Sequence, residues 1–172
     1  FITEAAASGP MFETNLDAMY AWLGIAVVSV AAAGVAATFP SSPPPDADGV
    51  AHTVDSVAVG EYPATAEHGL AAERIRLAPG SVSLDDGRGI ARSDLDAPRV
   101  TPVTRSGSGS EDGERLRRVL EGAPPKAVFD DPDAFAAAAE RARTTAPSWE
   151  RAPDRLTARR VHYGTVRVTL VG

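Results

Sequence analysis

The sequence contains no cysteine in its 172 residues. This absence excludes a disulfide scaffold, a thiol nucleophile and thiolate ligands for a metal. A lipoprotein anchor, which is attached through a cysteine, is excluded for the same reason. The compartment stays open, because a chain without cysteine is compatible with both oxidising and reducing surroundings.

Positive charge is missing from the first 73 positions, which carry nine acidic residues. Positions 74–172 carry fourteen acids and seventeen bases, of which only Lys126 is a lysine, and the whole chain has a formal charge of −6. This arginine bias is typical of a salt-adapted proteome encoded by GC-rich DNA. In molar salt the Debye length is about 3 Å, so such charges serve solubility and short contacts.

Large apolar side chains are scarce after position 40. The 132 residues from Ser41 onward include 49 hydrophobic ones, of which 21 are alanine and 28 are larger. This number suffices for the core of one modest domain and leaves little volume for an internal pocket.

One long hydrophobic run interrupts this pattern. Residues 19–39 read MYAWLGIAVVSVAAAGVAATF and carry no charge. As an α-helix this run would be roughly 30 Å long, which matches the hydrocarbon core of a bilayer. A cleaved secretory signal would have a basic start and a shorter apolar stretch. We therefore expect a transmembrane helix at 19–39 that contacts the lipid bilayer, preceded by a short tail at 1–18.

The segment 40–47 contains Pro43, Pro44 and Pro45, which favour an extended, semi-rigid stem. Proline also disfavours helix in the residues before it, so we expect the helix to stop near Phe39 instead of continuing into the following domain. A filament-forming type IV pilin has one long unbroken helix in this place. No base lies within 20 residues of the run, so the positive-inside rule gives no orientation. The acidic stem and the larger C-terminal part favour an extracytoplasmic domain.

Residues 48–172 are predicted to form a soluble α+β domain, with one small antiparallel sheet and two or three helices against it. Helical spacing of apolar residues appears after Asp48, around Leu116 and after Asp131, where Pro132 is suited to the first turn. Alternation predicts strands, and residues 105–113 (RSGSGSEDG) read as a flexible loop. The predicted strands are at 75–77, at 82–84, within 99–104 as an edge, and at 155–162 and 165–171.

No pattern of catalytic or metal-binding residues emerges. His52, His68 and His162 fall in different predicted elements, without a second histidine or a carboxylate pair at metal-ligand spacing. The residue types of a hydrolase triad occur in Ser81, Ser83, His68 and Asp85, but no G-x-S-x-G motif accompanies them. Asp131 is explained as a helix cap better than as a calcium ligand. We therefore predict no enzymatic activity and no cofactor.

Arginines gather near the C-terminus. A hairpin over 155–171 would bring some of them onto one surface, which we predict as a partner surface: Arg155, Arg159, Arg160 and Arg167, with Arg151 nearby. The alternative is local pairing with the chain's own excess of acids. No aromatic residues interleave with these arginines, so nucleic-acid binding is not expected.

The runs MFETNLDAMYAWLGIAVVSVAAAGVAATF and LRRVLEGAPPKAVFDDPDAF, with the closing RVTLVG, resemble a family of single-pass membrane proteins of halophilic archaea. The likeness covers about residues 11–172. It implies a gene neighbourhood of type IV pilus-like or secretion machinery at the cell surface, and it carries over no catalytic residues. The expected function is a non-enzymatic, membrane-anchored accessory protein of such an assembly with protein partners. The alternative is an extracytoplasmic ligand-binding or sensing module.

Overall fold

The computed structural model describes residues 44–97, 99–105 and 110–172, and the residues from Pro44 onward form one compact unit. No helix within these ranges is long and apolar enough to cross a membrane. The predicted transmembrane segment 19–39 and the tail 1–18 lie outside the described residues.

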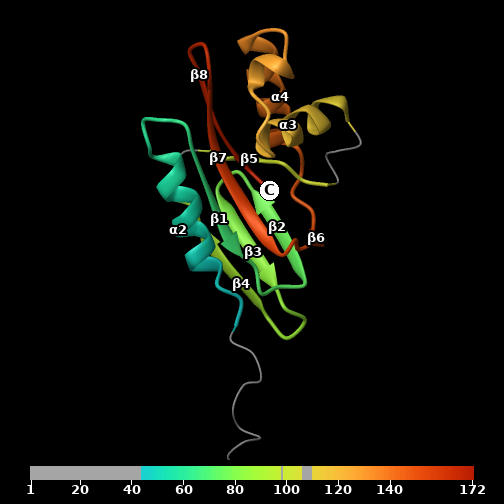
Figure 1. Ribbon diagram of the computed structural model, residues 1–172. Helices are drawn as coiled ribbons and strands as arrows, with labels where there is room; N and C mark the ends of the chain where they lie inside the picture. Colours follow the sequence, from blue (N-terminus) through green and yellow to red (C-terminus); the bar gives the residue numbers. More distant parts are fainter. Residues whose placement is uncertain (1–43, 98, 106–109) are drawn as a thin grey trace, which may run out of the picture. The chain divides into compact units, whose positions relative to one another are not determined.

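The described unit is a small α+β domain, as expected from the sequence (Figure 1). Its helices are α2 (Ala47–Ala58), α3 (Glu111–Leu120) and α4 (Pro132–Thr144), with a 3-10 turn η2 (Pro125–Ala127) before α4. Its strands are β1 (Ala64–Gly69), β2 (Arg74–Ala78), β3 (Ser81–Asp85), β4 (Ile90–Asp94), β5 (Thr101–Pro102), β6 (Glu150–Arg151), β7 (Arg155–Tyr163) and β8 (Val166–Val171).

These strands form two four-stranded sheets, whereas the sequence predicted one. The first sheet has the order β1-β7-β8-β5 and the second has the order β4-β3-β2-β6. Every pair is antiparallel except β5 with β8. The edge strands β1 and β4 were not predicted, because neither has the alternating large apolar residues of a half-buried strand.

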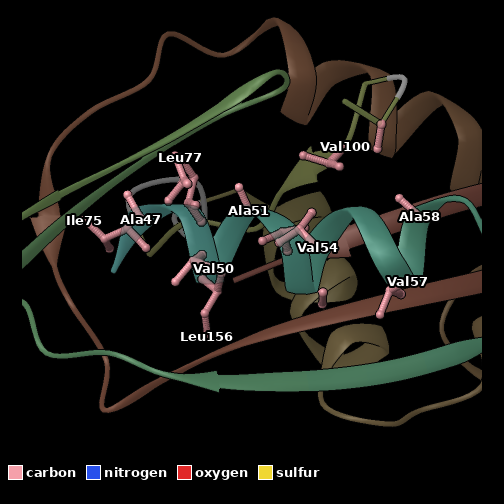
Figure 2. Packing of buried hydrophobic residues seen from close by; sticks show 14 of the residues in the cluster. Ala47, Val50, Ala51, Val54, Val57, Ala58, Ile75, Leu77, Val100 and Leu156 are labelled. Atoms are coloured by element: carbon pink, nitrogen blue, oxygen red, sulfur yellow. The ribbon is translucent and has the colours of Figure 1, made fainter. Parts of the chain in front are cut away.

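Helix α2 contributes six of the fifteen buried residues of one hydrophobic cluster, which also contains residues of both sheets. Its buried face includes Val50, Val54 and Val57, at the spacing predicted from the sequence. Figure 2 shows this face together with Ile75 and Leu77 of the second sheet and Leu156 of the first. We call this group, which also contains Ala158 and Val171, the α2 cluster.

The start of α2 corrects the predicted boundary of the stem. Asp46 caps the helix by accepting a hydrogen bond from the backbone N–H of Gly49 at 2.8 Å, so the helix begins at Ala47, within the predicted stem 40–47. Residues 44–46 are not helical. No continuous helix therefore runs through them into α2.

Helices α3 and α4 pack on the other face of the first sheet. Their buried residues form a second cluster with Val161, Val168 and Leu170 of β7 and β8, which we call the α3–α4 cluster. The rings of Phe129 and Phe135 are both buried in this cluster, with centroids 5.3 Å apart.

Both helices have side-chain N-caps. Ser110 accepts from the N–H of Gly113 at 3.1 Å, and Asp131 accepts from the N–H of Ala134 at 2.7 Å. The first cap corrects the predicted loop 105–113: residues 111–113 form the first turn of α3, where three acids near the start suit the helix dipole. The prediction of Asp131 as N-cap, followed by Pro132, is confirmed.

Replacing Phe135 by alanine should lower the free energy of unfolding by about 3–5 kcal/mol, because the ring is fully buried and a cavity would remain. Tyr62, which is 77% exposed, is the matched aromatic control, and Tyr62→Ala should change stability by no more than about 0.5 kcal/mol. Denaturant unfolding of the two variants checks this. Equal effects would show that the ring of Phe135 is not part of the core.

Candidate functional site

The four arginines of the predicted partner surface lie in two pairs on opposite faces of the first sheet. Side chains alternate along β7, so Arg155 and Arg159 share the face of Val161, whereas Arg160 points to the α2 side. Arg167 stands opposite His162 across the hairpin and so shares the face of Arg160. The hairpin therefore does not gather the group on one surface, because adjacent residues of a strand cannot share a face.

Two of these arginines hold the helices against the sheet. Arg159 donates from Nη1 to the carbonyl oxygen of Val119 at 2.7 Å, at the C-terminal end of α3. Arg160 donates from Nη1 to the carbonyl of Ala58, the last residue of α2. Each cation also meets the negative end of a helix dipole. Neighbouring arginines on one strand thus cap two helices on opposite faces of the sheet.

The other arginines are more exposed. Arg155 forms an ion pair with Glu67 of β1 at 2.8 Å, with 69% and 49% of the two side chains exposed. Arg167 is exposed and makes no hydrogen bond or ion pair within the described ranges. Arg151 lies in β6 of the second sheet. Local pairing with an acid, the alternative considered for this group, therefore accounts for Arg155, whereas Arg159 and Arg160 pair with helix carbonyls.

One candidate site is a cleft of about 320 Å³ between the second sheet and the end of the first. We call it the inter-sheet cleft. Its apolar lining comes from both hydrophobic clusters: Ile75, Leu77 and Leu156 from the α2 cluster, with Val103 and Leu120 from the α3–α4 cluster. The sequence suggested little volume for a pocket. The cleft exists because the two clusters meet beside the end of β8, at Gly172, without closing over each other.

The charged lining of the inter-sheet cleft is mostly basic. Four arginines and two glutamates reach it: Arg105, Arg117, Arg151, Arg155, Glu121 and Glu150. Glu150 is held in place by the loop after β5, since its Oε2 accepts from the backbone N–H of Arg105 at 2.7 Å. The excess of basic side chains contrasts with the net charge of −6 of the whole chain. The cleft therefore combines buried apolar side chains with charged side chains that are mostly basic.

A shallower hollow continues the cleft across the first sheet. It shares Leu120, Glu121 and Thr157 with the cleft and extends to Thr65 and Glu67 of β1. Arg159 also reaches this hollow. Of the predicted partner surface, Arg155 and Arg159 therefore lie along the cleft and its continuation, whereas Arg160 and Arg167 do not line either.

The side chain of His68 contacts Thr53 and Asp46 instead of the serines and Asp85 that the sequence suggested as partners in a hydrolase triad. Its Nδ1 lies 3.1 Å from Thr53 Oγ1, and its Nε2 lies 3.9 Å from Asp46 Oδ2. The hydroxyl of Thr53 also donates to the backbone carbonyl of Gly49 at 2.9 Å.

The hydrogen bonds of Asp85 involve other residues than His68. It accepts from Arg74 and from the backbone N–H of Gly87 at 2.8 Å, and these hydrogen bonds hold the pKa of its carboxyl below the usual range. Asp85 therefore orders the turn after β3. In the part of the chain that the structure describes, no group of three or more His, Asp or Glu residues is placed to hold a metal ion.

Comparison with known proteins shows that the chain belongs to a family of unknown function, DUF7283, whose family model matches residues 13–161. No curated protein and no solved structure matches the chain. The match establishes the family. The membrane location and the pilus-like association implied by the resemblance stay predictions.

Removing either helix-capping arginine should destabilise the domain. We expect Arg159→Ala to cost about 1–3 kcal/mol, because it leaves a carbonyl of α3 without its charged donor. Arg88→Ala, at an exposed turn position, is the matched control and should cost less than about 0.5 kcal/mol. Denaturant unfolding measures both, and equal losses would contradict a capping role for Arg159.

Stability should fall as the pH drops below neutral. Burial, with the positive charges of Arg167 and Arg160, lowers the pKa of His162 below its usual 6.5. The unfolded chain then binds the proton more readily than the folded one, so this contribution is complete above pH 6.5 and is lost as the pH falls from there through the folded pKa. Thermal unfolding between pH 8 and 5 should show a smaller decline for His162→Gln than for the unmodified chain.

Arg167→Gln provides a second arm of this experiment. It removes one of the two charges that oppose protonation of His162, and so should also reduce the decline. An unchanged pH profile in both variants would exclude His162 as its source.

Proposed function

We propose that the chain is a non-enzymatic, single-pass membrane protein of halophilic archaea that presents its α+β domain outside the cell. In this role it is an accessory part of a pilus-like or secretion assembly and works through protein partners. The observation that carries the proposal is the uncharged run 19–39, which is long enough to span a bilayer and is followed by a proline-rich segment.

Two further observations support this role. The family match runs from residue 13 to residue 161 and so includes both the apolar run and most of the domain. The non-helical residues 44–46 and the cap at Asp46 make α2 a separate helix. A filament subunit of the pilin type relies on one helix that continues into its globular part, so the break favours an accessory subunit.

Membrane fractionation tests the anchor. The full chain should sediment with membranes after an alkaline wash. Val28→Arg combined with Val30→Arg should release it, because each arginine near the middle of a span costs about 2.5–3.5 kcal/mol on insertion. The matched control carries Val59→Arg and Ile90→Arg, at positions that are 69% and 64% exposed, and should still sediment. Release of the unmodified chain by the alkaline wash would contradict the prediction of a transmembrane anchor.

Two experiments, one on intact cells and one on native membranes, test the rest of the proposal. Protease added outside should remove the domain, and a domain that stays protected while a known surface protein is cut would overturn the outward placement. Crosslinking in native membranes should join the chain to components of a surface assembly. Crosslinks confined to cytoplasmic enzymes would contradict the accessory role.

The second candidate function is an extracytoplasmic ligand-binding or sensing module. The inter-sheet cleft favours it, because its volume of about 320 Å³ lies at the lower end of the range for small-molecule sites. Its mixed lining, apolar with several charged groups, is also typical of such sites.

A further inference from the structure

We propose that the inter-sheet cleft binds an organic anion that joins an apolar body to a carboxylate or similar headgroup. The inference rests on the second candidate function and is independent of the membrane anchor. It combines three features of the cleft: its apolar lining, its basic rim, and a weakly held arginine within that rim.

The apolar lining would receive the body of the ligand. Ile75, Leu77 and Leu156 enter from the α2 cluster, and Val103 and Leu120 enter from the other side. Each is buried in the core for most of its surface and presents only its remaining edge to the cleft. A ligand seated here removes these edges from water, which favours an apolar body over a fully hydrated one.

The rim supplies the positive charge. Arg151 is exposed and makes no ion pair in the part of the chain that the structure describes. Arg155 is paired with Glu67, but both side chains are about half exposed or more, and such surface pairs contribute little. Its guanidinium can therefore exchange Glu67 for a ligand carboxylate at small cost. A planar guanidinium binds a carboxylate through two parallel hydrogen bonds.

The acidic lining residues do not cancel this preference. Glu150 already accepts the backbone N–H of Arg105, which offsets part of its charge. Among the described residues, Glu121 is the one other acid that lines the cleft, against four arginines. In high salt only short contacts retain their strength, so the preference for an anion depends on a headgroup that touches Arg151 or Arg155 directly.

Three matched probes test the charge preference: 4-phenylbutyrate, 4-phenyl-1-butanol and 4-phenylbutylamine, which share an apolar body and differ in headgroup. Titration calorimetry uses the full chain in the form that fractionation yields, either in lipid nanodiscs with empty nanodiscs as the blank or in buffer. The carboxylate should bind at least about tenfold more tightly than the alcohol, and the amine more weakly than both. If fractionation shows that the chain has no membrane anchor, the same titrations are done in buffer and test the cleft equally well.

Variants locate the binding. Arg151→Gln with Arg155→Gln should lower the affinity for 4-phenylbutyrate about tenfold and abolish its advantage over the alcohol. Arg88→Gln with Arg167→Gln removes the same charge from exposed positions outside the cleft and should change neither. Thr157→Phe, which places a ring in the cleft, should abolish binding of all three probes.

Each contrary result overturns the proposal. It is wrong if none of the probes binds, if the amine binds as tightly as the carboxylate, or if the two double variants have equal effects. Thermal unfolding of each variant confirms that the domain is folded in the assay. The rim variants change exposed side chains, so the conclusion does not depend on whether Thr157→Phe folds.

Discussion

Strand β7 has both faces buried along its central part, and the rest of the domain is arranged around it. Leu156 and Ala158 point into the α2 cluster, whereas Val161 points into the α3–α4 cluster. The same alternation sends Arg160 to the end of α2 and Arg159 to the end of α3. One strand therefore supplies apolar contact and a charged helix cap to both layers, and a shift of its register by one residue would exchange the two sets.

The elements that the sequence predicted are those with strong local signals. Helix α4 begins at Asp131 and Pro132 as expected, and the hairpin of β7 and β8 turns at Gly164, which has a φ of +58°. Strands β1 and β4 carry little apolar side-chain volume, so local pattern did not reveal them. The partner of β1 is the distant strand β7, whereas β4 forms a hairpin with the preceding strand β3. The division into two sheets is likewise a matter of long-range pairing.

The candidate site was harder to foresee than the fold. Its lining comes from β2, α3, β6, β7 and the segments after β5 and β8, which no single stretch of sequence brings together. One signal was available and was missed: Arg159 and Arg160 are adjacent in a predicted strand, so they had to face opposite sides of the sheet. That rule alone separates Arg155 and Arg159, which line the cleft or its continuation, from Arg160.

Arginine suits helix capping and carboxylate binding better than lysine does. A guanidinium presents several donors in a fixed plane, so it can satisfy a helix carbonyl or a carboxylate with defined geometry. Exposed pairs such as Arg92 with Asp94 are screened in concentrated salt, whereas the partly buried contacts of Arg159 and Arg160 are screened much less.

Because the inter-sheet cleft is lined by both hydrophobic clusters, a ligand there would contact both layers at once. Binding to the folded state alone stabilises it by mass action, so occupancy of the cleft and the stability of both layers are linked. The α2 cluster includes Ala47, next to the cap at Asp46 and the proline-rich segment. The N-terminal end of the described domain thus shares a core with the cleft, so ligand binding in the cleft is linked to the stability of α2.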